Sequence, residues 1–217
     1  MRTERSREWR PVADAFVLFG FGLGASLFLS AVEEDVTLRK AILTIDLSLF
    51  LAGLSFPVWL AGPRTEYWRR FCRWTWIAAL LAYLAHFYYS LWGVFGRGGR
   101  SFGDAVTVAW ETQGALVTVS NFAVTVLWTL DAFLPRGARG RWRDVLSVVT
   151  RLLVLTSFVL AALVFRHAGN MHGPTLPLGL PLVTLLGGAL VAGSVGGLLW
   201  RLLNWRLDPL PAGDEPG

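Results

Sequence analysis

The sequence of 217 residues has little charge and almost no cysteine. Asp, Glu, Lys and Arg together make up 16% of the residues, whereas 54% are hydrophobic. This composition leaves too little polar surface to coat a soluble domain of this size. The one cysteine, Cys72, cannot form an internal disulfide and has no second thiol with which to hold a metal. A soluble fold and a disulfide framework are therefore excluded.

The familiar motifs of several enzyme classes are also absent. The sequence has no HExxH, no GxSxG and no glycine-rich loop that ends in Lys-Ser or Lys-Thr. A haem with two histidine ligands is disfavoured, because His86 is the one histidine that falls within an apolar run. No cofactor is predicted.

Six long apolar runs are present instead, at about 12–32, 41–62, 72–95, 114–134, 145–165 and 178–200. Each reaches the roughly 20 residues that cross ~30 Å of hydrocarbon as a helix. The sequence therefore predicts an all-α fold, a polytopic transmembrane bundle of six helices in a single domain over residues 1–206. The segment 207–217 is rich in Pro, Gly and acidic residues, which predicts a mobile tail. The first run reads as a retained signal anchor.

Arginine clusters alternate with arginine-poor segments between these runs. The rich segments precede the first run and separate the second from the third and the fourth from the fifth: Arg2, Arg5, Arg7 and Arg10; Arg64, Arg69, Arg70 and Arg73; Arg136, Arg139, Arg141 and Arg143. By the positive-inside rule these segments and both termini lie in the cytoplasm, which predicts the plasma (inner) membrane. This distribution also explains the net charge of +5 without a nucleic-acid partner.

Tryptophans are expected at the membrane interfaces, where indole rings settle. Nine fall at the predicted inner interface, among them Trp59, Trp76 and Trp128, whereas Trp92 and Trp110 fall at the outer one. Residues 101–113 begin with a capping-box pattern from Ser101 to Asp104, which predicts an interfacial helix that leads into the fourth span.

Small residues recur every four positions in the first and sixth runs. They are Gly20 and Gly24 in the first run, and Gly188, Ala192 and Gly196 in the sixth, with Gly187, Gly193 and Gly197 alongside. Such faces let helices approach closely. They are explained either by packing within the bundle or by self-association or contact with another membrane subunit.

Polar side chains at membrane depth are the strongest candidates for a functional site, because they are costly there. His86 and Asn121 lie at similar depth in neighbouring antiparallel runs, each with further polar residues at helical spacing. The predicted seam, which could hold a lipid head group, a quinone or a proton, contains Asp46, Tyr83, His86, Tyr89, Ser90 and Asn121. The alternative is that these groups hydrogen-bond one another and only order the bundle.

Two further groups could interact. Asp131 and Arg151 lie about one turn inside facing helix ends and are predicted to form an ion pair. His167, Met171 and His172 lie within six residues of one outer loop, where imidazole and thioether groups could bind copper weakly.

Three functions remain open. The leading hypothesis is an integral membrane accessory or scaffold subunit that contacts membrane lipid and could hold a lipid or quinone at the seam. The second is a small membrane enzyme or proton-coupled transporter that uses His86, with Asp46 setting its pKa. The third is a copper-binding membrane protein that faces the periplasm.

Overall fold

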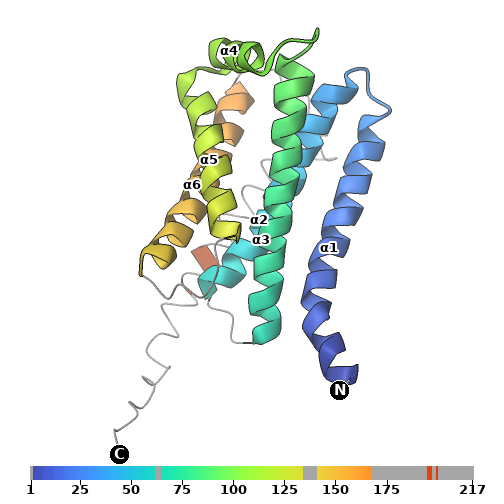
Figure 1. Cartoon of the computed structure of the whole chain (residues 1–217), viewed down its shortest axis with the longest axis vertical. Coiled ribbons are helices and arrows are strands. Elements are labelled where there is room, and N and C mark those ends of the chain that lie inside the picture. The colour runs from blue at the N-terminus through green and yellow to red at the C-terminus, as the bar shows by residue number, and fades with distance from the viewer. Residues whose placement is uncertain (1, 62–64, 134–140, 168–194, 197–198, 200–217) are drawn as a thin grey trace, which may run out of the picture.

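A computed structural model describes residues 2–61, 65–133, 141–167, 195–196 and 199 of the chain (Figure 1). Their regular elements are all helical, and none of these residues forms a strand. The elements are α1 (Arg2–Ser30), α2 (Val36–Ala61), α3 (Glu66–Tyr88), the π-helix η1 (Tyr89–Phe95), α4 (Phe102–Gln113), α5 (Ala115–Phe133) and α6 (Arg141–His167).

Four segments are long and apolar enough to cross a membrane, namely Trp9–Ser30, Val36–Ala61, Glu66–Phe95 and Ala115–Phe133. Within α6, Val145–Phe158 forms a shorter apolar segment. The chain is therefore a helical bundle of the multi-pass membrane type. The predicted sixth span at 178–200 and the tail at 207–217 lie outside the described residues, and the sidedness of the termini stays a prediction.

The helices begin earlier than the apolar runs that predict them. α1 starts at Arg2 instead of residue 12 and includes Pro11, α2 starts at Val36 instead of 41, and α3 starts at Glu66 instead of 72. Hydropathy marks only the apolar part of a helix, whereas caps set where its backbone begins. The Thr65 hydroxyl accepts from the Trp68 amide at 3.4 Å, and the Asp35 carboxylate accepts from the Leu38 amide at 3.0 Å.

The core lies between α2 and α3, with α1 on one side and α5 and α6 on the other (Figure 1). Small buried side chains on the two central helices allow their backbones to approach closely. The Ser48 hydroxyl accordingly reaches the Ala79 carbonyl of the facing helix, to which it donates at 2.9 Å. The Ser26 hydroxyl of α1 donates in the same way to the Leu43 carbonyl of α2, at 3.3 Å.

The third predicted span changes its winding near its end. After Tyr88 the chain continues as the π-helix η1, in which Gly93 lies so close to Thr37 of α2 that a Cβ at this position would collide with the Thr37 methyl group. The helix predicted at 101–113 is confirmed as α4, and the Ser101–Asp104 capping box is complete, whereas its position at a membrane interface stays a prediction. Figure 1 shows α4 lying across the end of the bundle opposite the N-terminus.

Candidate functional site

The predicted seam joins three helices. The His86 ring of α3 lies with Nδ1 2.8 Å from the Ala41 carbonyl oxygen of α2. Because a carbonyl can only accept, Nδ1 carries the proton of this hydrogen bond. On the neighbouring face of α3, the Tyr83 hydroxyl donates to the Asn121 carbonyl of α5 at 3.2 Å. Both side chains thus tie α3 to an adjacent helix.

The other predicted seam residues differ in their position relative to His86. The Ser90 hydroxyl is 3.5 Å from both ring nitrogens of His86, one helical turn further along. The Tyr89 ring instead forms a cation–π contact with Lys40, whose Nζ lies 5.6 Å from the ring centroid. Tyr83, His86, Ser90 and Asn121 are therefore brought together, whereas Tyr89 faces α2.

Asp46 is not part of this group in the structure. It is buried in α2 at 8% exposure, but it lies about 140° around the helix from Ala41, since successive residues turn by about 100°. No hydrogen bond joins Asp46 to His86 among the described residues, and Arg39, two turns earlier, is the charged residue with which it interacts. The hypothesis that Asp46 sets the pKa of His86 is therefore not supported by a contact between the two side chains.

A second polar cluster lies toward the opposite end of the bundle, where α2, α3, α5 and α6 meet. Arg151 Nη1 donates to Asp131 Oδ2 at 2.8 Å, and each side chain is 9% exposed. The same carboxylate oxygen accepts from Trp76 Nε1 at 2.8 Å, and Arg151 Nη1 also donates to Ser147 Oγ at 3.0 Å. The predicted partners thus lie in an ion pair with two additional hydrogen bonds.

Two indole rings lie against the buried guanidinium. The Arg151 Cζ atom lies 4.7 Å from the Trp59 ring centroid and 4.4 Å from the Trp76 ring centroid. A desolvated cation in contact with indole rings is stabilised by the ring quadrupoles, by about 2 kcal/mol or more for each contact. Arg151 Nε is buried without a hydrogen-bond partner among the described residues, so the rings supply much of its environment.

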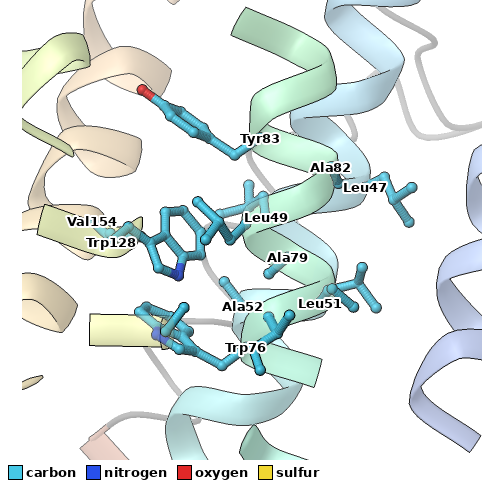
Figure 2. Packing of buried hydrophobic residues seen from close by; sticks show 14 of the residues in the cluster. Leu47, Leu49, Leu51, Ala52, Trp76, Ala79, Ala82, Tyr83, Trp128 and Val154 are labelled. Atoms are coloured by element: carbon cyan, nitrogen blue, oxygen red, sulfur yellow. The ribbon is translucent and has the colours of Figure 1, made fainter. Parts of the chain in front are cut away.

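A row of tilted rings connects the ion pair to the seam. Trp76 and Trp128 lie 4.6 Å apart between centroids, Trp128 and Tyr83 lie 5.6 Å apart, and Tyr83 and His86 lie 6.1 Å apart. Figure 2 shows Tyr83, Trp128 and Trp76 one below the other on the side of α3 that faces α5. Aromatic side chains therefore lie between the two polar sites.

This aromatic packing corrects the expectation for two tryptophans. The side chains of Trp76 and Trp128 are buried in the core at 2% and 0% exposure, instead of facing lipid head groups as interfacial indoles do, and their depth in the membrane stays a prediction. Trp76 lies ten residues into α3, about 15 Å along the helix, and Asp131 gives its indole N–H a buried partner. Nothing in the sequence alone pairs Trp59 and Trp76 with Arg151.

The predicted copper site and one glycine face lie largely outside the described residues. Of the three copper-ligand candidates, His167 ends α6, while Met171 and His172 lie beyond the described part of the chain. Among the residues that the structure describes, no cluster of three or more His, Cys, Asp or Glu could hold a metal ion. In the sixth run the described glycine is Gly196.

The first glycine face is described in full. A Cβ at Gly20 or Gly24 would meet nothing within 4 Å, whereas a Cβ at Gly22 would collide with Leu47 of α2. Gly22 is therefore the glycine of α1 that permits close packing within the bundle. Gly20 and Gly24 point away from the described helices.

An ion pair links two loops at the end of the bundle where α4 lies. Arg97 Nη2 donates to both carboxylate oxygens of Asp35, at 2.6 and 2.5 Å, and so links the α1–α2 loop to the residues after η1. This hydrogen bond, together with the Leu38 amide, holds the pKa of Asp35 below its ordinary value. The pair is exposed, so its energetic contribution is small.

Comparison of the chain with protein-family models, with curated proteins and with solved structures finds no match.

Proposed function

We propose that this chain is a non-catalytic accessory subunit of an integral membrane assembly, with its polar seam serving to hold the helices together. The observation that carries this proposal is how the central seam groups are used. The His86 Nδ1–H bonds the Ala41 carbonyl, and the Tyr83 hydroxyl bonds the Asn121 carbonyl. Each such bond contributes about 1 kcal/mol to packing in a bilayer, where no water competes for it.

The barrier between the two polar sites supports the same function. A proton relay from Asp131 to His86 would need a continuous row of titratable groups or water, but the indole rings of Trp76 and Trp128 lie between Asp131 and Tyr83. The ion pair of Asp131 and Arg151 is likewise closed by Trp59 and Trp76. Both sites connect neighbouring helices, as a scaffold requires.

The partner-binding face of this subunit is the outer side of α1. Its apolar segment is the least buried of the four candidate spans. Val17, Gly20, Phe21, Gly24 and Phe28 lie on this side, and the two glycines would let a second helix approach closely. We assign this face to a helix of another membrane subunit, with self-association as the competing outcome.

Arginine distribution supports the placement of the subunit. The clusters before α1, between α2 and α3 and between α5 and α6 put both termini in the cytoplasm of a plasma (inner) membrane. Reporter fusions at Arg100 and Gly137 test this orientation. The expected result is an outside signal at Arg100 and an inside signal at Gly137, and the reverse pattern would invert the assignment.

The structural role of His86 is tested by two substitutions. His86→Gln keeps an amide donor that can reach the Ala41 carbonyl, whereas His86→Ala removes it. The expected result is that His86→Ala lowers the melting temperature and the yield of copurified partner together, while His86→Gln retains most of both. Tyr88→Ala is the control, because Tyr88 is 58% exposed on the same helix.

A second candidate function is proton acceptance or ligand binding at His86, and one observation favours it. A π-helix, η1, begins three residues after His86 and carries Ser90, and π-helical segments frequently accompany functional sites. His86 Nε2 would then accept a proton or bond a lipid head group or quinone. On this account His86→Gln abolishes the activity of the copurified assembly while its composition is unchanged.

A further inference from the structure

Helix α4 has three distinct faces. Ala105 and Ala109 are buried against the end of the bundle. Phe102, Val106 and Trp110 follow one another on the adjacent face within about 80° of the helix circumference. Phe102 and Trp110 are nonetheless about half exposed, at 49% and 48%.

The polar residues of α4 occupy a separate sector. Asp104, Thr107 and Glu111 lie within about 60° of one another, on the side away from the buried alanines. All three are exposed. The helix thus has a packed face, an exposed apolar face and an exposed polar face, which is the arrangement of a helix that lies along an interface between oil and water.

The chain itself fixes the depth of α4. One end follows η1 after the short segment 96–101, and the other end meets α5 through the single residue Gly114, whose φ of 86° permits the sharp turn. Both neighbours are the ends of candidate membrane spans. Figure 1 shows α4 lying across these ends. Its exposed apolar face is therefore held where the hydrocarbon of a bilayer ends.

A neighbouring tryptophan extends the apolar face onto the span below. Trp92 of η1 is 43% exposed, and its ring centroid lies 6.0 Å from that of Phe102. Trp92, Phe102, Val106 and Trp110 form the surface that we call the aromatic ledge. Indole rings favour the layer between lipid head groups and acyl chains, because one edge is polar and the remainder apolar.

We propose that the aromatic ledge binds the bilayer itself, with these side chains inserted at the boundary between head groups and acyl chains, so that α4 anchors the α3–α5 connection to the membrane surface. The capping box supports this role. The Ser101 hydroxyl accepts from the Asp104 amide, and the Ser101 amide donates to Asp104, so the helix begins in water without further burial. A twelve-residue helix is marginal alone, and insertion of its apolar face would stabilise it.

Depth measurement by electron paramagnetic resonance tests the ledge in the full-length chain. The background is Cys72→Ser, which keeps a donor for the Ser55 carbonyl. Single nitroxide labels are placed by Trp110→Cys and, as the matched control one residue further on, Glu111→Cys. The protein is reconstituted in vesicles of phosphatidylethanolamine and phosphatidylglycerol. Collisions with oxygen and with a water-soluble nickel chelate are compared.

The expected result is a severalfold higher ratio of oxygen to nickel collisions at position 110 than at position 111. Equal ratios would overturn the proposal, and so would a label at 110 that neither reagent reaches, because a protein partner would then cover the ledge. The unsubstituted protein provides a second measurement. A lipid-tethered carbene precursor is expected to modify Phe102, Val106 or Trp110 more than Thr107 and Glu111, and preferential modification of the polar face would contradict the proposal.

Discussion

Asp131 of α5 and Arg151 of α6 form an ion pair of 2.8 Å in which each side chain is nine-tenths buried. Arg151 lies about 9 Å beyond Val145, where the apolar part of α6 begins. A lone cation at this depth would be costly, and the structure offsets that cost with one carboxylate and two indole rings. The pair therefore fixes how α6 packs against α5 and α3.

Removal of one charge from this pair is expected to destabilise the bundle. Asp131→Asn keeps an oxygen that can accept from Trp76 Nε1, but it leaves Arg151 buried without an anion. The expected loss in the free energy of unfolding is about 3–5 kcal/mol, measured by equilibrium unfolding in mixed micelles. The double variant Asp131→Leu/Arg151→Met should recover most of this loss, because neither charge then remains buried.

The control for this prediction is an ion pair at the surface. Arg69 and Glu66 form a pair of 3.0 Å in which both side chains are more than half exposed. Arg69→Gln should change the free energy of unfolding by about 0–1 kcal/mol. If Asp131→Asn has an effect as small as this, the buried pair does not hold α5 and α6 together.

Two buried tryptophans should respond differently to the same substitution. Trp76→Phe and Trp128→Phe remove the same atoms, but Trp76 Nε1 donates to Asp131, whereas Trp128 Nε1 has no hydrogen-bond partner among the described residues. A bond to a carboxylate contributes about 1.5–3 kcal/mol. Trp76→Phe should therefore cost more stability than Trp128→Phe in chemical unfolding. Equal losses would show that the indole bond contributes little.

Substitutions at the glycines of α1 should distinguish packing within the bundle from contact with a partner helix. Gly22→Leu places a large side chain against the buried Leu47 and should lower the free energy of unfolding by about 1–3 kcal/mol. A Cβ at Gly20 or Gly24 meets no atom within 4 Å. Gly20→Leu and Gly24→Leu should therefore leave the stability of the isolated chain unchanged or slightly raised.

Copurification from the native membrane provides the second readout. Gly20→Leu and Gly24→Leu are expected to reduce the yield of the partner subunit, and Val126→Leu at an exposed position of α5 is the control. Normal partner yield with bulky residues at both glycines would rule out this face as the contact.

The Asp35–Arg97 pair predicts a dependence of stability on pH. The pKa of Asp35 is lower in the folded than in the unfolded chain, because Arg97 stabilises the carboxylate. Its contribution is therefore present above the unfolded pKa of about 3.9 and is lost as the pH falls through the lower, folded value.

The wild-type chain should exceed Asp35→Asn in stability by about 0–1 kcal/mol at pH 7, and the difference should disappear in acid. Thermal unfolding between pH 7 and pH 3 measures it. Asn at position 35 can still accept from the Leu38 amide, so the helix cap is retained. Glu34→Gln in the same exposed loop is the control. A difference that persists in acid would show that charge is not its source.

The apolar runs predict the existence of the described helices but not their ends. Hydropathy detects residues that tolerate hydrocarbon, and it does not detect the Thr65 cap or the polar start of α1. It also cannot distinguish a π-helix from an α-helix, so η1 was not predicted. The capping box did predict α4, because that signal resides in two side chains three positions apart.

A polar contact can be predicted from the sequence only where the depth of the two residues along their helices is enough to bring them together. Asp131 and Arg151 lie at one level on helices that follow each other in the chain, and the structure pairs them. Asp46 and His86 also lie on consecutive helices, but rotation about the helix axis directs Asp46 elsewhere. Rotation likewise turns Trp76 and Trp128 inward, and tertiary packing determines that rotation.

The central claim is that this chain is a subunit of a larger membrane assembly. Native mass spectrometry of the protein, gently extracted from its own membrane, tests this most directly, because it records partner chains, lipids and small molecules together. The account predicts a stoichiometric second chain, lost in the Gly20→Leu/Gly24→Leu variant. A lone monomer that retains a small molecule, lost on substitution of His86, would contradict it and would make the seam a ligand-binding site.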